Sequence, residues 1–305
     1  MPRQSSIDLD SPERPFDNII NFRDVAQSIN KFCGEQILRE GVIYRSARLD
    51  DASERDKRRL TDELHIATVV DLRSQTEHLM GTRKRRAENA GSTENIDLNG
   101  SIPIADEHLL QIPDCHRALI SLTGKAFERA LLWKLDWATY MKVIIMVATG
   151  YRADAVRLVG EQVMQPRGLT GLAKDTLDAS TAEIRAFFEL LARDESYPLL
   201  VHCTQGKDRT GLVILMILLL LEKVPTAAIM DDYVRSELEL VPEFEERMKE
   251  IRLLGLGKEY TRCPPGFVDA TTEYLNAKYG GVVGYLDGIG INAEMQEHIR
   301  RKLLL

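Results

Sequence analysis

Cysteine is scarce in this chain, with four residues among 305: Cys33, Cys115, Cys203 and Cys263. No two of them have the Cys-x-x-Cys spacing, and no cluster of histidines accompanies them. Paired ligands at short spacing are what a structural zinc site requires. We therefore expect no metal site and no bound cofactor.

Long apolar runs are also lacking. The first 17 residues contain no apolar core of the kind that marks a signal peptide. The apolar run at residues 212–221 has ten residues, whereas a helix that spans a bilayer needs about 20. We expect a chain without a transmembrane segment, in a reducing cytoplasmic compartment that keeps its thiols free.

An excess of positive charge is absent as well. The chain has 40 lysines and arginines against 47 aspartates and glutamates, a net charge of -7. This balance argues against general nucleic-acid binding, which needs a basic surface. Residues 83–86 form a cationic run in a loop-like segment. We expect a solvated loop there, and the alternatives are transient contact with an anionic membrane surface and a nuclear localisation signal.

What the sequence does contain is an ordered succession of strand, tight loop and helix at residues 197–221. Residues 197–201 form a short apolar run, typical of a buried strand. The unbroken apolar run that begins after Gly211 is typical of a helix buried on all sides. The nine residues 202–210 connect the two elements.

This connecting loop has the chemistry of a phosphate site. Backbone N–H groups at a helix N-terminus attract anions, and Gly206 lets the backbone approach one closely. Arg209 offers a planar fork that can hold two phosphate oxygens. The same groups favour a thiolate at Cys203, and Thr210 can donate a hydrogen bond to the sulfur. A thiolate beneath a bound phosphate is placed for in-line attack on phosphorus.

The pattern Cys-x5-Arg-Thr, with His202 before it and Gly206-Lys207-Asp208 inside it, resembles the signature of the cysteine-dependent protein tyrosine phosphatases. It is most similar to the branch called tyrosine phosphatase family 3. Other stretches that resemble this branch are residues 21–24, 44–46, 70–74 and 272–305.

The resemblance implies an α/β fold in which helices flank a central, mostly parallel sheet. It also implies a phosphomonoester hydrolase that forms a cysteinyl-phosphate. The implied substrates are phosphotyrosine, phosphotyrosine together with other phosphoresidues (dual specificity), or phosphoinositides. The Asn-Phe-Arg-Asp segment at 21–24 is expected beside the active site. The alternative there is a structural turn with a salt bridge between Arg23 and Asp24.

In this interpretation Cys203 is the nucleophile, and Arg209 stabilises the transition state. The C-terminal end of a β-prone run at 66–72 delivers Asp71 and Arg73, and ligands bind beyond the carboxyl ends of such strands. A structural ion pair is the alternative for both. The predicted substrate-binding residues are His202, Thr204, Gln205, Gly206, Lys207, Thr210, Gly211, Asp71 and Arg73.

The general acid is ambiguous. Many relatives in the resembling family use an aspartate in a mobile Trp-Pro-Asp loop, and this chain has no such tripeptide. Asp208, inside the signature, is the first candidate, and Asp71 and Asp106 are the others. Lys207 either adds a second cation at the pocket rim, which favours substrates with more than one phosphate, or folds back to neutralise Asp208.

Other functions leave weaker traces. A nucleotide-binding P-loop is excluded because Asp208 stands where Ser or Thr would hold Mg²⁺. A sulfur-transfer enzyme of rhodanese type remains a remote alternative. A protein that binds phosphorylated ligands without turnover is the runner-up, although Cys203, Arg209 and Thr210 are all present.

For domain organisation, we predict a disordered segment at 1–15 and a single phosphatase domain at 16–305. Residues 106–165 have a helical pattern, with apolar residues mostly at spacings of three and four over 129–147, and form an insertion that is either a lid or an extra packing layer. Members of the resembling family carry helical lids. Ser53 and Ser180 are each expected to cap a helix.

Overall fold

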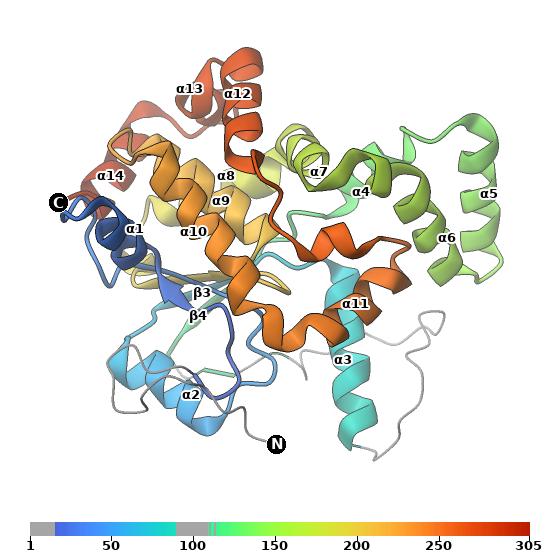
Figure 1. Cartoon of the computed structure of the whole chain (residues 1–305), viewed down its shortest axis with the longest axis horizontal. Helices are drawn as coiled ribbons and strands as arrows, with labels where there is room; N and C mark the ends of the chain where they lie inside the picture. Colours follow the sequence, from blue (N-terminus) through green and yellow to red (C-terminus); the bar gives the residue numbers. More distant parts are fainter. Residues whose placement is uncertain (1–15, 90–108, 110, 113) are drawn as a thin grey trace.

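The computed structural model describes residues 16–89, 109, 111–112 and 114–305 (Figure 1). The segments 1–15 and 90–108, which include the predicted disordered segment and Asp106, lie outside the described residues. Among the described residues, the helices are too short or too polar to cross a bilayer.

A five-stranded sheet forms the centre of the protein, in the order β1-β2-β5-β3-β4. β2, β5, β3 and β4 are parallel, and only the short edge strand β1 is antiparallel. This architecture confirms the predicted α/β fold with a mostly parallel sheet. The strands are β1 Arg23–Asp24, β2 Ile43–Ser46, β3 Thr68–Asp71, β4 His116–Leu119 and β5 Leu199–His202.

Both faces of the central strands are buried, as the apolar run at 197–201 predicted. Leu199 and Val201 of β5 pack into the large core that contains the helix α9 (Asp208–Leu220). Leu200 points the other way, into a smaller core with Tyr44 and Leu60. Because β5 lies between β2 and β3, the loop that follows it emerges at the middle of the sheet's carboxyl edge.

Helices cover both faces of this sheet (Figure 1). α9 is buried almost all round, and its residues 212–218 are at most 2% exposed. The helices outside the segment 125–179 are α1 Val25–Cys33, α2 Glu54–Arg58, α3 Gln75–Asn89, α8 Thr181–Leu191, α9 Asp208–Leu220, α10 Thr226–Glu239, α11 Phe244–Leu253, α12 Phe267–Tyr279, α13 Gly281–Gly288 and α14 Ala293–Leu303.

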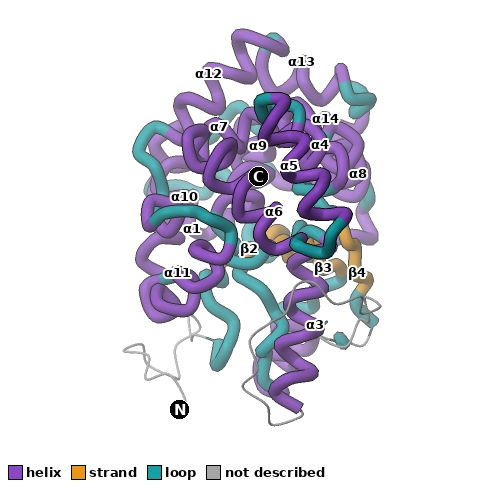
Figure 2. Tube along the Cα trace, turned by 90° about the vertical axis from the view of Figure 1, so that its right-hand side faces the viewer, coloured by secondary structure: helices purple, strands orange, loops and turns teal. Residues whose placement is uncertain are grey.

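A lobe of four helices projects from one side of the sheet, on the right in Figure 1 and facing the viewer in Figure 2. We call it the helical lobe. It comprises α4 Lys125–Leu132, α5 Trp137–Ala148, α6 Arg152–Val159 and α7 Gln165–Ala179.

The predicted insertion differs from this lobe in two respects. First, β4 lies within 106–165, and it is a strand of the sheet rather than a helix. Second, the helical spacing at 129–147 extends over two helices, α4 and α5. Asp136 separates them because its carboxylate accepts hydrogen bonds from the N–H groups of Ala138 and Thr139 and so begins a new helix.

Two other local predictions were wrong. The cationic run 83–86 is not a loop, because it lies within α3, and the Arg83 side chain is buried. Ser180 does not cap α8, because its hydroxyl donates instead to the carbonyl of Leu122 at 2.6 Å. The capping box at Ser53 is confirmed, since Ser53 and Asp56 exchange hydrogen bonds at the start of α2.

Candidate active site

The loop between β5 and α9 curls around the sulfur of Cys203, which is 2% exposed. Gly206 has φ = 65°, a left-handed conformation that glycine adopts without strain. A Cβ at this position would lie 2.0 Å from the carbonyl oxygen of Ser46. The turn directs the Gly206 N–H at the sulfur, with 3.2 Å between N and Sγ. A thiolate here therefore has one amide donor already in place.

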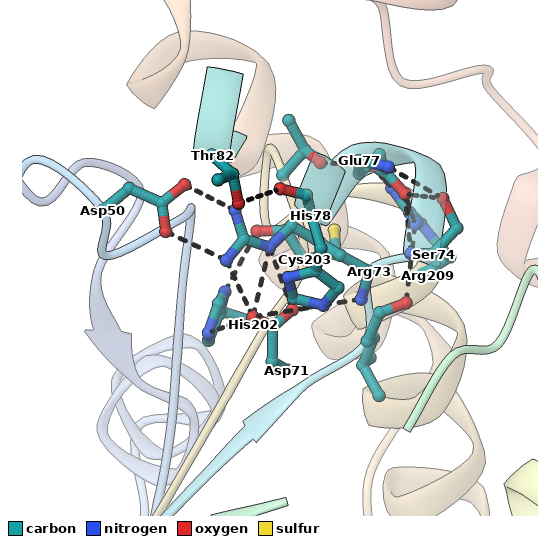
Figure 3. Close-up of polar contacts among 12 residues, drawn as sticks. Asp50, Asp71, Arg73, Ser74, Glu77, His78, Thr82, His202, Cys203 and Arg209 are labelled. Carbon is teal, nitrogen blue, oxygen red and sulfur yellow. Dashed lines mark hydrogen bonds and ion pairs between the residues drawn. The ribbon is translucent and has the colours of Figure 1, made fainter. Parts of the chain in front are cut away.

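Glu77 forms a two-point ion pair with the guanidinium of Arg209 (Figure 3). Its two carboxylate oxygens accept from Nη1 at 2.5 Å and from Nη2 at 2.6 Å. Burial opposes the charge of Glu77, but the Arg209 charge and hydrogen bonds outweigh it and lower the Glu77 pKa to about 2. The hydroxyl of Thr204 also donates to this carboxylate. Glu77 is therefore a fixed anion that ties Arg209 to the loop.

This pairing leaves one edge of the Arg209 guanidinium for a substrate. The side chain has five N–H donors, and Glu77 takes the end-on pair on Nη1 and Nη2. Nη1 also lies 3.4 Å from the Leu72 carbonyl and 3.3 Å from the Thr123 hydroxyl. Within the part of the chain that the structure describes, no acceptor bonds to Nε. The Nε–Nη2 edge can thus hold two oxygens of a phosphate.

Beneath the loop lies a buried charge cluster at the end of β3. Asp71 accepts from Arg73, with 2.8 Å between Oδ2 and Nη2, and Arg73 also pairs with Asp50. Burial opposes the charge of Asp71, but the nearby His202 imidazole and Arg73 hold its pKa well below the ordinary value. Burial in turn lowers the pKa of His202, whose Nδ1 is 3.2 Å from the Cys203 carbonyl.

This arrangement differs from the expectation that Asp71 faces a bound phosphate. Asp71 is 0% exposed and lies outside the cleft described below. Its charge is neutralised by Arg73, as in the alternative of a structural ion pair. Arg73 does line the cleft, but carboxylates occupy both of its terminal nitrogens. Both residues therefore support the loop from below.

A second buried cluster holds the loop from the side of β2. Asn21 donates to the carbonyls of Gln205 and Gly206, and Arg45 donates to the Gly206 carbonyl at 2.7 Å. Arg45 is itself held by Asp232, whose pKa is lowered to about 2. Burial opposes the charge of Asp232, and the adjacent arginines more than compensate for it. Because these donors bind the carbonyl groups on the outer side of the loop, the N–H groups of the loop can point toward the anion site.

The Asn-Phe-Arg-Asp segment thus lies beside the loop, as the resemblance implied. The proposed salt bridge between Arg23 and Asp24 was wrong. Arg23 pairs with Asp232 at 2.7 Å, and burial lowers the Arg23 pKa to about 10. Asp24 accepts instead from the N–H groups of Ala26 and Gln27 at the start of α1.

Lys207 and Asp208 form an ion pair in the second half of the loop. Nζ of Lys207 lies 2.6 Å from Asp208 Oδ1 and 2.7 Å from the carbonyl of Arg262, and the lysine is 0% exposed. Of the two interpretations of Lys207, the structure favours the one in which it folds back toward Asp208. The Asp208 side chain is 32% exposed and lines the cleft, so it can approach a leaving group.

The remaining loop residues differ from expectation in one respect. The hydroxyl of Thr210 is buried, and no hydrogen bond to the Cys203 sulfur forms among the described residues. Gln205 is bound by Arg247, with 3.1 Å between Oε1 and Nη2. At Gly211, a Cβ would lie 2.9 Å from the ring of Tyr233, so only glycine lets α9 pack this closely.

A cleft of about 650 Å³ opens above the loop. Cys203, Thr204, Gln205, Asp208 and Arg209 line one end of it. The helical lobe and α11 form much of the remaining wall, and residues 48–51 and 73–81 also contribute to it. Its volume falls within the range of about 300–1,000 Å³ that is usual for small-molecule sites.

Three residues of the site escaped the sequence interpretation: Glu77, Arg45 and Asp232. For Glu77 a local signal existed, because Ser74 and Glu77 have the spacing of a capping box. The N–H and hydroxyl of Ser74 both donate to Glu77 at 2.9 Å. Arg45 and Asp232 are 187 positions apart, and no local pattern connects them.

Known phosphatases are similar to this chain in sequence. The sequence model described as "Tyrosine phosphatase family" matches residues 14–305. The chain is similar to the "Triple specificity protein phosphatase PtpB" of Mycobacterium tuberculosis (strain ATCC 25618 / H37Rv), with 28% identity over 312 residues, 93% of this chain and 96% of that protein. It is also similar to a "Tyrosine-protein phosphatase" of Nostoc commune, with 30% identity over 139 residues, 42% of this chain and 46% of that protein.

Proposed function

This chain belongs to the tyrosine phosphatase family, and we propose that it hydrolyses phosphate monoesters through a covalent cysteinyl-phosphate on Cys203. The observation that carries the proposal is the position of the sulfur. It lies at the N-terminus of α9, with the Gly206 amide 3.2 Å away and Arg209 fixed beside it by Glu77. The thiolate is the nucleophilic form of a cysteine, and these N–H donors are placed to bind an anion at the sulfur.

In the first step, the sulfur of Cys203 attacks phosphorus, the S–P bond forms and the ester P–O bond breaks. The loop N–H groups and the Nε–Nη2 edge of Arg209 stabilise the equatorial oxygens. Asp208 donates a proton to the leaving oxygen. In the second step, Asp208 takes a proton from water, the water attacks phosphorus, and phosphate leaves with regeneration of the thiolate.

Phosphotyrosine is the first proposed substrate, and phosphoserine or phosphothreonine would follow from dual specificity. The family match and the names of both relatives support a tyrosine phosphatase. Phosphoinositides remain a second candidate, together with transient membrane contact, because the cleft wall is largely apolar. The buried position of Lys207 does not favour recognition of a second phosphate. A cytoplasmic location is part of the proposal, since a reducing compartment keeps Cys203 reduced.

A substrate panel tests this proposal. Phosphate release from p-nitrophenyl phosphate, phosphopeptides and soluble phosphoinositides is measured for the wild type and for Cys203→Ser. We expect the wild type to be active, the serine variant to be inactive on every substrate, and acid-quenched wild type to carry phosphate on Cys203. A wild type that binds phosphopeptide but releases no phosphate would instead support the runner-up, a binding protein on this fold.

A further inference from the structure

The cleft above Cys203 has a polar end and a long apolar end. Arg209, Asp208 and Thr204 lie at the polar end. Leu212 of α9 and Ala173 of α7 line the cleft and belong to the same apolar core as Cys203. Side chains of the helical lobe and of the residue that follows α11 continue the apolar wall, among them Leu131, Val143, Val156, Val159, Leu172 and Leu254. A phosphate bound at the loop would therefore direct its organic part along a hydrocarbon surface.

The charges along this cleft do not favour a second phosphate. Four arginines line it among the described residues, against six carboxylates. Carboxylates already pair with several of these arginines: Arg48 pairs with Glu250 at 2.8 Å and with Glu246 at 3.3 Å, and Arg73 pairs with Asp50 and Asp71. An anionic group placed away from Arg209 would meet a wall with a net negative balance. The cleft thus favours one phosphate on an otherwise uncharged molecule.

We propose that the apolar end of the cleft holds the hydrocarbon chain of a single-chain phosphate monoester, such as a long-chain alkyl phosphate or a monoacylglycerol phosphate. The phosphate lies on the loop and the chain runs between α4, α6, α7 and α11. This inference rests on the proposed phosphatase function and names a substrate class for the same site.

A hydrocarbon chain fits this wall better than a peptide does. An extended peptide brings an N–H and a C=O at nearly every residue. Burial of such a polar group without a hydrogen-bond partner is unfavourable and costs free energy. The wall residues Leu131, Val156 and Leu172 have no polar side-chain atoms to offer such groups. A hydrocarbon chain needs no partner and gains free energy with every methylene that leaves water.

The chain-length dependence of hydrolysis tests the proposal. Phosphate release is measured with full-length protein on n-alkyl phosphates of increasing length, each below its micelle concentration. We expect kcat/KM to rise by up to about fourfold per methylene, the gain from full burial of such a group, and to reach a plateau when the cleft is full. A flat series overturns the proposal. Monoacylglycerol phosphates of matched chain length show whether the glycerol linker is tolerated.

Two substitutions test whether the hydrocarbon chain of the substrate binds in the cleft. Ala155 lines the cleft from α6 and is 2% exposed, so Ala155→Phe should narrow it. The expected result is an at least tenfold fall in the ratio of kcat/KM for decyl over butyl phosphate. Leu172→Ala should move the plateau to longer chains. Ala148→Phe is the matched control, because Ala148 is exposed on α5 and lies outside the cleft lining. Thermal unfolding of each variant identifies loss of folding.

A second assay, with phosphopeptides, tests whether a peptide rather than a hydrocarbon chain occupies the apolar end of the cleft. Phosphotyrosine peptides with leucine or serine at the flanking positions are compared in the same assay. A preference for leucine with no chain-length effect in the alkyl series assigns the cleft to a peptide and overturns the proposal. If p-nitrophenyl phosphate is hydrolysed while both series are flat, the substrate class is wrong and the phosphatase function stands. If no monoester is hydrolysed, both fail.

Discussion

Glu77 determines which edge of Arg209 meets the substrate. We expect Glu77→Gln to lower kcat/KM by about 10- to 100-fold, because a charge-assisted pair contributes roughly 1.5–3 kcal/mol and a glutamine amide can accept from Arg209 with only one atom. Steady-state kinetics on p-nitrophenyl phosphate measures the effect. Glu128→Gln is the matched control, since Glu128 also lines the cleft but is exposed and makes no contact with Arg209. Equal losses in both variants would contradict the assignment.

Asp208 is the proposed general acid, so the loss of kcat when it is replaced should depend on how much the leaving group needs a proton. We expect Asp208→Asn to lower kcat by about 10²- to 10⁴-fold on alkyl phosphates, the usual contribution of general acid catalysis. The loss on p-nitrophenyl phosphate should be smaller, because its leaving group needs little protonation. The alkaline limb of the pH–rate profile should also disappear, since asparagine has no proton to lose.

The control for this variant is Asp114→Asn, because Asp114 is distant from Asp208 in the sequence and is not among the residues that line the cleft. Asp114 has φ = 56°, a conformation that asparagine tolerates well. Because Asp208 is a partner of the buried Lys207, thermal unfolding is recorded for both variants. An unchanged pH profile in folded Asp208→Asn would transfer the role to another acid, and Asp106 would then be tested.

Single side chains differ in how far the sequence identifies them. Cys203 and Arg209 follow from chemistry, because a thiol and a guanidinium six positions apart across a strand–helix junction suit a phosphate. Their roles remain proposals, but their positions agree with that interpretation. Arg45 and Asp232 were not identified, since their contact depends on how α10 packs near β2. The expectation that Asp71 faces the phosphate failed for a related reason. The sequence predicted that Asp71 lies at the end of a strand, but not the direction in which its side chain points.

The strand–loop–helix unit depends on one left-handed residue. We expect Gly206→Ala to abolish most activity and to destabilise the protein, because its Cβ would lie 2.0 Å from the Ser46 oxygen in addition to the strain of φ = 65°. Gly34→Ala is the matched control: Gly34 has φ = 71° but no atom within 4 Å of the added Cβ. It should cost about 1 kcal/mol, from conformation alone, and keep activity.

Urea unfolding and p-nitrophenyl phosphate hydrolysis are measured for both glycine variants. The difference between them isolates the steric clash at the loop from the conformational strain that both share. If the two variants lose stability equally and both stay active, the close approach of Gly206 to β2 is not what shapes the loop.

Elements with a strong apolar pattern were predicted well, and those with a weak pattern were not. β5 and α9 are buried on all sides, so their apolar runs are unambiguous. β4, with the sequence His-Arg-Ala-Leu, has no buried residue and lies at the edge of the sheet, so it carries no strand signature. The break between α4 and α5 escaped notice because apolar spacing continues across Asp136. Periodicity reports which residues are buried, not where a cap ends a helix.

Over the whole protein, the class of the fold was predictable, but the strand order was not. Alternation of apolar strands with helical segments indicates a parallel sheet. The order β1-β2-β5-β3-β4 depends on which crossovers pack together, and a single sequence contains little information on that point. The consequence for the site is large, because this order brings Asn21 and Glu77, from two distant parts of the chain, to the loop that contains Arg209.

The site also depends on buried and half-buried ion pairs, so the stability of the whole protein should depend on pH. Glu77 and Asp232 each have a pKa lowered to about 2, and the pKa of Asp71 is well below its ordinary value. Carboxylates with a lowered folded-state pKa stabilise the protein above their ordinary pKa near 4, and the contribution is lost as pH falls toward the folded-state value. The free energy of unfolding should change little from these groups between about pH 5 and 7.

Below that range, each of these carboxylates should add a slope of about 1.4 kcal/mol per pH unit between about pH 4 and 2. Urea unfolding at closely spaced pH values measures it. Asp232→Asn should remove one group's share of the slope and lower stability at neutral pH by about 3–5 kcal/mol, because Arg23 and Arg45 lose their buried counter-ion. Asp194→Asn, which disrupts an exposed pair with Lys302, should change neither quantity appreciably. An acid slope that is the same in all three proteins would show that the buried pairs do not connect the active-site loop to global stability.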